Sequence, residues 1–290
     1  MNLSGHNYYI EHIECILIFS LIGFIVNGLA NKIRFYKFPD TSFFIPIKIS
    51  LIHVILCFAI YLVNSLFLPP LLLPKLRPLF HSLSYQTLVF WTQVLVMLFS
   101  LITILGFCLI TLRNNFKRIW KDLKKNSSLI QDCSFGILTL FIAFPLVAIV
   151  EQCADILVYM LFGVESYEQV AVIYLKMALK APSQLVAALI LILFAAPVME
   201  ELLFRGLLQT WIKKHLGIKA AILITSLCFA LFHMSETHGV GNFSLIPSLF
   251  VFSCFLGFIY ERQRSLFASI VLHMTFNLSS TLRILFTIDS

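Results

Sequence analysis

Apolar runs of about twenty residues recur along this chain, and they constrain its fold more than any other feature. A helix needs about 20 apolar residues to cross the roughly 30 Å hydrocarbon core of a bilayer. The sequence therefore predicts an all-α integral membrane protein with about eight transmembrane helices. The eight runs cover approximately residues 13–30, 49–68, 87–112, 134–161, 182–201 and beyond, 220–233, 245–260 and 266–286.

The composition agrees with a membrane setting. Hydrophobic residues make up 60% of the chain and charged residues only 12%, against about 25% charged in soluble domains. The net charge of +7 does not indicate nucleic-acid binding, because the basic residues fall in short clusters between the apolar runs. We expect a multi-pass protein of the cell membrane whose surroundings are the lipid bilayer and not nucleic acid.

The distribution of basic residues predicts the orientation. Sorted by the loops between the eight runs, 15 of the 21 Lys and Arg residues fall on one side and five on the other, with Arg205 left inside a run. Loops rich in Lys and Arg remain in the cytoplasm, so both termini are expected outside it. The larger set comprises Lys32, Arg34, Lys37, Lys48, Arg113, Lys117, Arg118, Lys121, Lys124, Lys125, Lys213, Lys214, Lys219, Arg262 and Arg264, and the smaller set Lys75, Arg77, Lys176, Lys180 and Arg283.

Four prolines follow the second apolar run. Pro69, Pro70, Pro74 and Pro78 each lack a backbone N–H, and proline is normally excluded from helix interiors. This segment is predicted to be a stiff, non-helical connector.

The fifth run ends in Pro-Val-Met-Glu-Glu-Leu-Leu-Phe-Arg, where charge is costly unless it is paired or used. At about 100° per residue, Glu201 and Arg205 stack one turn apart, whereas Glu200 points about 140° away from Arg205. Glu201 is therefore expected to form a supporting ion pair, which leaves Glu200 able to exchange protons. Pro197 should bend the helix by its clash with the carbonyl of Leu193. A charged helix end at the membrane surface is the simpler alternative.

Polar residues also occur in two later runs. His233 ends the sixth run, and His273 and Asn277 share one helix face in the eighth. At about 1.5 Å per residue, Glu200, His233 and Asn277 each lie about 20 Å from the nearest cytoplasmic cluster, and His273 about 14 Å. A lone membrane histidine is most often a helix-packing residue, but the similar depth predicts that these four side chains meet in one cavity.

Such a set is sufficient for amide hydrolysis. A carboxylate beside a histidine can deprotonate a water molecule, while a second histidine and an amide can donate hydrogen bonds to an oxyanion. The sequence contains no HExxH zinc motif and no GxSxG serine motif. These residues therefore fit amide hydrolysis by a glutamate- and histidine-activated water, and the resemblance described next implies an intramembrane endopeptidase.

The three polar groups, in order, resemble a known family. EExxxR at Glu200 to Arg205, FxxxH at 229–233 and HxxxN at 273–277 are the motifs of the CPBP intramembrane proteases. This family includes the type II CAAX prenyl endopeptidases and the bacteriocin-processing and immunity (Abi) proteins. The resemblance implies a CPBP-like catalytic transmembrane core over residues 181–287, preceded by an N-terminal transmembrane region, residues 1–180, of unknown role.

The resemblance also implies roles. Glu200 and His233 would activate the water, His273 and Asn277 would form the oxyanion site, and Glu201 with Arg205 would hold the helix in place. The substrate would be a membrane-associated peptide or protein, through CAAX-type or leader-peptide processing. The alternative is a non-enzymatic protein, either an immunity factor or a proton-coupled transporter.

Metal dependence is a separate question, because the family is often described as metalloproteases. Glu200, His233 and His273 could supply the three protein ligands of a catalytic zinc ion. Ligand histidines usually need a second partner on the other ring nitrogen, and the spans offer few carboxylates for that purpose. We therefore expect that no cofactor is required, with zinc as the alternative.

Overall fold

The computed structural model describes residues 3–38, 47–122, 127–164, 175, 176, 178, 179 and 181–288. The regular elements among these residues are all helices, so the predicted all-α class is confirmed. The described residues contain no strand, although Lys121 and Ser265 form an isolated β-bridge. Lys124, Lys125 and Lys180, which entered the topology prediction, lie outside the described residues. The helical segments are α1 (Leu3–Lys32), α2 (Leu51–Leu76), α3 (Tyr85–Leu112), α4 (Asn114–Trp120), α5 (Leu129–Phe162), α7 (Pro182–Ile190), η1 (Leu191–Ala195), α8 (Ala196–Glu201), η2 (Leu202–Gln209), α9 (Thr210–Phe232), η3 (Glu236–Gly241), α10 (Asn242–Gln263) and α11 (Leu266–Ile288).

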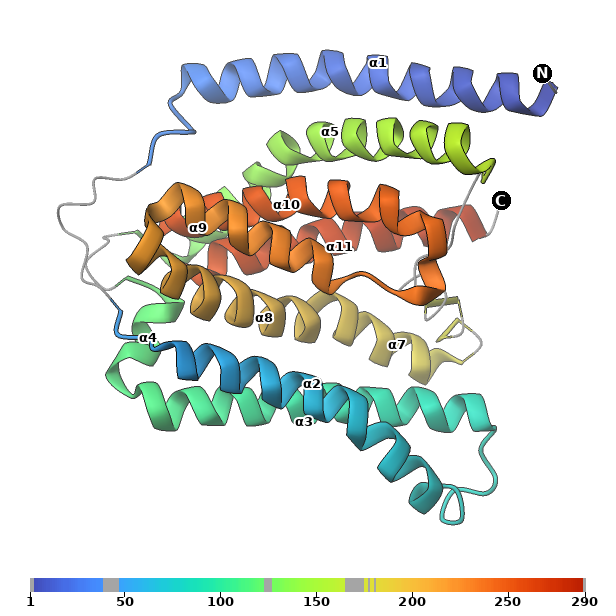
Figure 1. Ribbon diagram of the computed structural model, residues 1–290, viewed down its shortest axis with the longest axis vertical. Helices are drawn as coiled ribbons and strands as arrows, with labels where there is room; N and C mark the ends of the chain where they lie inside the picture. Colours follow the sequence, from blue (N-terminus) through green and yellow to red (C-terminus); the bar gives the residue numbers. More distant parts are fainter. Residues whose placement is uncertain are drawn as a thin grey trace.

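Six helical stretches among the described residues are long and apolar enough to cross a membrane, so the chain is a multi-pass membrane protein. The longest, Pro182–Phe232, has 51 residues and contains both the fifth and the sixth predicted runs. Gly217 interrupts it with φ 78° and ψ 173°, where two helices meet at a kink. Figure 1 shows the chain turning back between α8 and the end of α9. α11 corresponds to the eighth predicted run and is not among the six, which are Asn7–Lys32, Leu51–Leu76, Tyr85–Leu112, Leu129–Phe162, Pro182–Phe232 and Glu236–Gln263.

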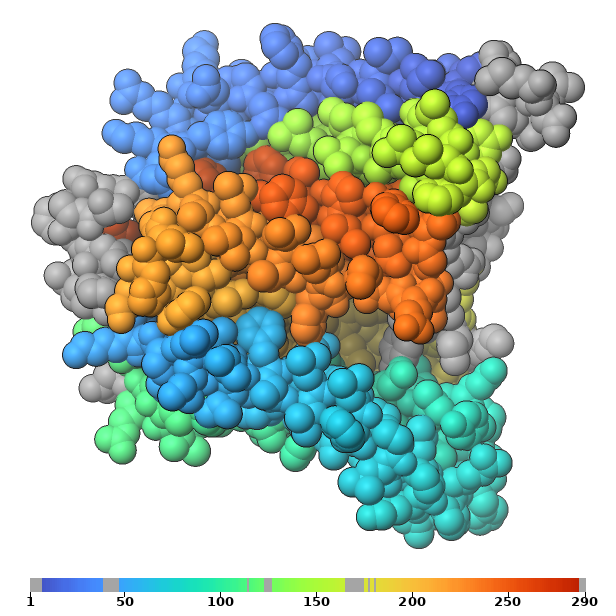
Figure 2. Space-filling model, in the orientation of Figure 1, coloured from blue at the N-terminus to red at the C-terminus, as the bar shows by residue number. Residues whose placement is uncertain are grey.

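The helices lie side by side, with α1 at one edge and the α2–α3 pair at the other (Figure 1). α5 packs against α1 and also against α10 and α11, while α2 contacts both α3 and η2. α1 and α2 also form opposite edges of the surface in Figure 2. Large apolar side chains point outward from both, such as Phe24 at 82% exposure and Phe67 at 65%. Apolar surface of this extent indicates contact with lipid.

α5 holds α11 at backbone contact distance. A Cβ atom on Gly136 of α5 would lie 2.6 Å from the carbonyl oxygen of Ala268 in α11, which is closer than atoms can approach. Small residues at helix crossings allow membrane helices to pack this tightly. Gly136 therefore helps to set the depth of α11 and of His273, which α11 carries.

The proline-rich segment after the second apolar run is helical, so the predicted non-helical connector is wrong there. Pro69, Pro70 and Pro74 all lie inside α2, which continues to Leu76. Membrane helices tolerate proline because neighbouring groups and small local adjustments satisfy the backbone carbonyls that proline leaves without a donor. Pro78 lies in the turn that follows α2.

Candidate active site

A cavity of about 490 Å³ lies between the η1–α8 segment, the end of α9, the start of α10 and α11. Glu200, His233, His273 and Asn277 all line it, so the structure brings the four predicted catalytic residues together. Apolar cavities with a few converging polar groups are the usual form of binding and catalytic sites. The apolar lining includes Ile192, Phe229, Phe232, Leu245, Leu249, Phe252 and Phe276.

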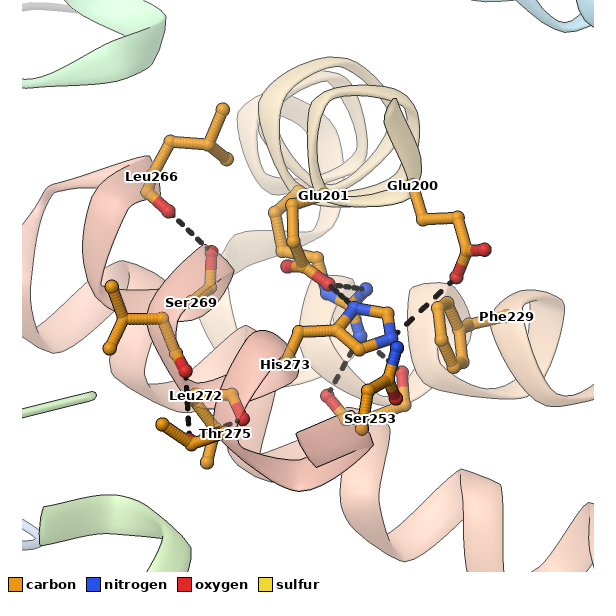
Figure 3. Close-up of polar contacts among 12 residues, drawn as sticks. Glu200, Glu201, Phe229, Ser253, Leu266, Ser269, Leu272, His273 and Thr275 are labelled. Atoms are coloured by element: carbon orange, nitrogen blue, oxygen red, sulfur yellow. Dashed lines mark hydrogen bonds and ion pairs between the residues drawn. The ribbon is translucent and has the colours of Figure 1, made fainter. Parts of the chain in front are cut away.

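Glu200 faces both histidines. Its Oε2 lies 3.6 Å from Nε2 of His233 and 3.8 Å from Nε2 of His273 (Figure 3 shows the second contact). Both distances exceed the length of a hydrogen bond, and this buried oxygen has no hydrogen-bond partner among the described residues. Polar atoms at such separations are commonly bridged by a water molecule, which here would touch the carboxylate and both rings.

Nδ1 of each histidine, the ring nitrogen that does not face Glu200, also has a hydrogen-bond partner. Nδ1 of His273 lies 2.9 Å from Oε1 of Glu201, and Nδ1 of His233 lies 2.8 Å from the carbonyl oxygen of Phe229. Carboxylate and carbonyl oxygens only accept hydrogen bonds, so each ring donates through Nδ1–H. In their neutral forms both histidines therefore turn the Nε2 lone pair toward Glu200. An added proton or a bridging donor is then needed to hold the three groups together.

Glu201 and Arg205 form the predicted ion pair, and both side chains are fully buried. Nη1 of Arg205 donates to Oε1 of Glu201 at 2.8 Å, and Nη2 donates to the hydroxyl of Ser253 at 2.6 Å. The guanidinium carbon also lies 4.6 Å from the ring centroid of Phe229. Because the same Glu201 oxygen faces His273, the ion pair both neutralises charge and orients that ring (Figure 3).

Asn277 is bonded to the backbone of a neighbouring helix. Its Nδ2 donates to the carbonyl oxygen of Ile192 at 2.8 Å. Ile192 belongs to the π-helical segment η1, which directly precedes α8 and Pro197. We expected Pro197 to disturb the carbonyl of Leu193, as in a regular α-helix. The π segment shifts the backbone pairing by one residue, so the carbonyl that needs a side-chain donor is that of Ile192.

Comparison with known proteins matches the segment that contains the four predicted catalytic residues. Residues 182–279 match the family model of the type II CAAX prenyl endopeptidases, Rce1-like. This segment, residues 182–279, is therefore similar to the CAAX proteases and is called the CAAX protease-like domain below. The resemblance inferred from the three motifs is thus confirmed, and the match belongs to a protease family. No curated protein and no solved structure matches the chain.

The CAAX protease-like domain has donor atoms of the type that zinc binds, namely Nε2 of His233 and His273 and the Glu200 carboxylate. The sequence offered few carboxylates as outer partners for these rings, apart from Glu201. Glu201 and the carbonyl of Phe229 provide one for each histidine. Across the described residues, however, no three His, Cys, Asp or Glu side chains are grouped closely enough to hold a metal ion. The donors therefore fit zinc in chemical type but not in their present arrangement.

Sequence reasoning gave no role to three residues of this site. Phe229 contacts both histidine rings, with centroid distances of 4.6 Å to His233 and 5.8 Å to His273, and its position one turn before His233 was the available signal. Ser253 binds Arg205, but a serine in an apolar helix carries no signal of its own. His238, from η3, is buried and lines the cavity.

Proposed function

We propose that the protein is an intramembrane endopeptidase of the cell membrane, which hydrolyses a peptide bond in a membrane-associated peptide or protein. The supporting observation is Oε2 of Glu200 facing Nε2 of His233 and of His273 in an apolar cavity of the CAAX protease-like domain. The substrate would be a CAAX-type carboxyl end or a leader peptide. Both present an extended segment next to the bilayer.

In the proposed reaction, Glu200 takes a proton from a water molecule held beside His233, and the water oxygen attacks the peptide carbonyl carbon. His273 carries an additional proton on Nε2 and donates it as a hydrogen bond to the developing oxyanion. Asn277 assists with the amide N–H that is not bonded to Ile192. When the C–N bond breaks, Glu200 returns its proton to the leaving amine.

Charge balance supports the protonated form of His273. Its ring lies between Glu200 and Glu201, 3.8 Å from one carboxylate and 2.9 Å from the other. With Arg205 beside Glu201, two negative and two positive groups then share the buried site, so no net charge is left unpaired. This mechanism requires no tightly bound zinc. A zinc ion held by Glu200, His233 and His273 is the alternative.

The proposed topology has eight crossings with both termini outside the cytoplasm. At about 1.5 Å per residue, the 51-residue stretch Pro182–Phe232 would span about 77 Å, more than twice the bilayer core. Its break at Gly217 and the length of α11 support two further crossings beyond the six. Reporter fusions at Lys121 and Ser290 should report opposite compartments. The same compartment for both would contradict the orientation.

Comparative membrane peptidomics tests the activity. Cells with the native protein should release peptides that are missing from cells with Glu200→Gln. The matched control is Glu236→Gln, which removes an exposed carboxylate close to the cavity in sequence. Identical peptide profiles in the native and Glu200→Gln cells would favour the non-enzymatic alternatives, an immunity factor or a transporter.

A further inference from the structure

The turn before Glu200 has an unusual backbone pairing. The N–H of Ala196 bonds to the carbonyl of Leu191, five residues back, which is the π-helical pattern. The next residue, Pro197, has no N–H to donate. The carbonyl of Ile192 would accept from Ala196 in an α-helix and from Pro197 in a π-helix, so neither backbone donor reaches it.

Asn277, on α11, supplies the missing hydrogen-bond donor. Its Nδ2 reaches the Ile192 carbonyl at 2.8 Å, whereas His273, one turn earlier on α11, reaches Glu201. The bond is half-buried, and a carbonyl that is shielded from water and has no donor costs free energy, so a side chain that supplies the bond stabilises this backbone form. α11 therefore makes two hydrogen bonds to the η1–α8 segment.

The π register decides where the carboxylates point. One additional residue in a helical turn rotates everything after it by about 100°, the angle that one residue occupies in an α-helix. If η1 reverted to α-helical pairing, Glu200 and Glu201 would turn by that angle relative to α7. Glu200 would then no longer face His233 and His273.

We propose that Asn277 is a positioning residue, whose amide replaces the backbone donor missing at Pro197, keeps η1 in its π register and so holds Glu200 toward the two histidines. The bond itself is independent of any reaction, while its effect on turnover rests on the proposed function. Asn277 in this role acts through Glu200, in addition to any contact of its second N–H with substrate.

A double-mutant cycle on the purified protein tests the bond. Asn277→Ala should lower the midpoint of thermal unfolding by about 3 to 6 °C, and Asn277→Asp by more, because a carboxylate would then face the Ile192 carbonyl. In a Pro197→Ala background a backbone N–H becomes available, so the effect of Asn277→Ala should shrink to about 1 °C or less. An equal drop in both backgrounds, or no drop in either, would overturn the proposal.

Turnover then separates positioning from oxyanion binding. Asn277→Ala should lower kcat by about 100-fold through misorientation of Glu200, and by less than about tenfold when Pro197→Ala is also present. An undiminished loss in an active Pro197→Ala background means that Asn277 acts as an oxyanion donor alone, which overturns the positioning role. If Pro197→Ala is itself inactive, the unfolding cycle decides. Because unfolding needs no substrate, failure of the proposed protease activity leaves that cycle intact.

Discussion

The two faces of α8 present the same side chain in opposite surroundings. On one face Glu201 is fully buried, paired with Arg205 and bonded to His273. On the other face Glu200 keeps 19% of its side chain exposed to the cavity. Oε2 has no hydrogen-bond partner among the described residues in either glutamate, but Glu201 is bonded through Oε1 and Glu200 is not. Adjacent glutamates thus differ in role because of the groups around them, not because of their own chemistry.

The difference has an energetic basis. A buried charge is tolerated when its partner and hydrogen bonds are all in place, and losing one of them exposes the full cost of desolvation. Arg205 contacts Glu201, Ser253 and Phe229 at once, and only its Nε has no hydrogen-bond partner among the described residues. Glu200 lacks such a fixed partner, which is the condition a group needs if it is to exchange protons with a substrate or a water molecule.

Glu200→Gln removes the carboxylate that faces the cavity, and it should have the largest effect of the variants considered. The amide keeps the shape but cannot take up a proton, so turnover should fall by roughly 100- to 10,000-fold at normal abundance. Peptide release by purified protein, together with quantitative immunoblotting of membranes, measures both quantities. The control Glu236→Gln should retain native turnover. Full activity in Glu200→Gln would remove Glu200 from the reaction.

Arg205→Ala removes the ion pair with Glu201, and its effect should be on folding. It leaves Glu201 buried without its cation, which typically costs about 3 to 5 kcal/mol. Less folded protein should accumulate in the membrane, and its unfolding midpoint in detergent should fall. The double variant Arg205→Met with Glu201→Gln serves as the control, since it removes both charges and should lose less than Arg205→Ala. Native stability in Arg205→Ala would contradict the structural role.

Ser253→Ala should also lower the stability of the buried Arg205 site, but by a smaller amount than Arg205→Ala. The hydroxyl accepts from Nη2 of Arg205 at 2.6 Å, and a hydrogen bond to a charged group contributes about 1.5 to 3 kcal/mol. The backbone carbonyl of Ser253, 3.3 Å from the same nitrogen, should retain part of this. Ser248→Ala is a matched control on α10, because among the described residues the Ser248 hydroxyl bonds within its own helix, to the carbonyl of Leu245. Equal unfolding midpoints for the two variants would show that the Ser253 hydroxyl is dispensable.

Features that depend on local spacing could be predicted from the sequence. The Glu201–Arg205 pair follows from a separation of one helical turn, and that spacing survives in the structure although η2 begins between the two residues. The shared cavity followed from depth, since Glu200, His233 and Asn277 are about equally far along the sequence from the basic clusters predicted to be cytoplasmic. Helix length and charge position suffice for both inferences.

Features that depend on contacts between helices could not be predicted. The second bond of Glu201, to His273, joins residues 72 positions apart. The π register of η1 leaves the Ile192 carbonyl to be bonded by Asn277, which belongs to α11. No periodicity in residues 182–201 indicates this register. The helical Pro69 and Pro70 contradict a rule that holds in water, because a membrane helix satisfies its freed carbonyls differently.

Metal removal should have the smallest effect and would sharpen the contrast within α8. A zinc ion on Glu200, His233 and His273 would give Glu200 a permanent partner, and both carboxylates would then be structurally engaged. In the proposed metal-free reaction Glu200 instead has a partner only while water or substrate is bound, so chelation followed by dialysis should leave turnover unchanged. Metal content and peptide release of the same purified sample measure this. Near-stoichiometric zinc, with activity lost on its removal and restored on its return, would instead make these three residues ligands. Glu200→Gln should in that case also lower the zinc content, whereas Glu236→Gln should not, and this difference separates a bound catalytic ion from zinc adsorbed elsewhere on the protein.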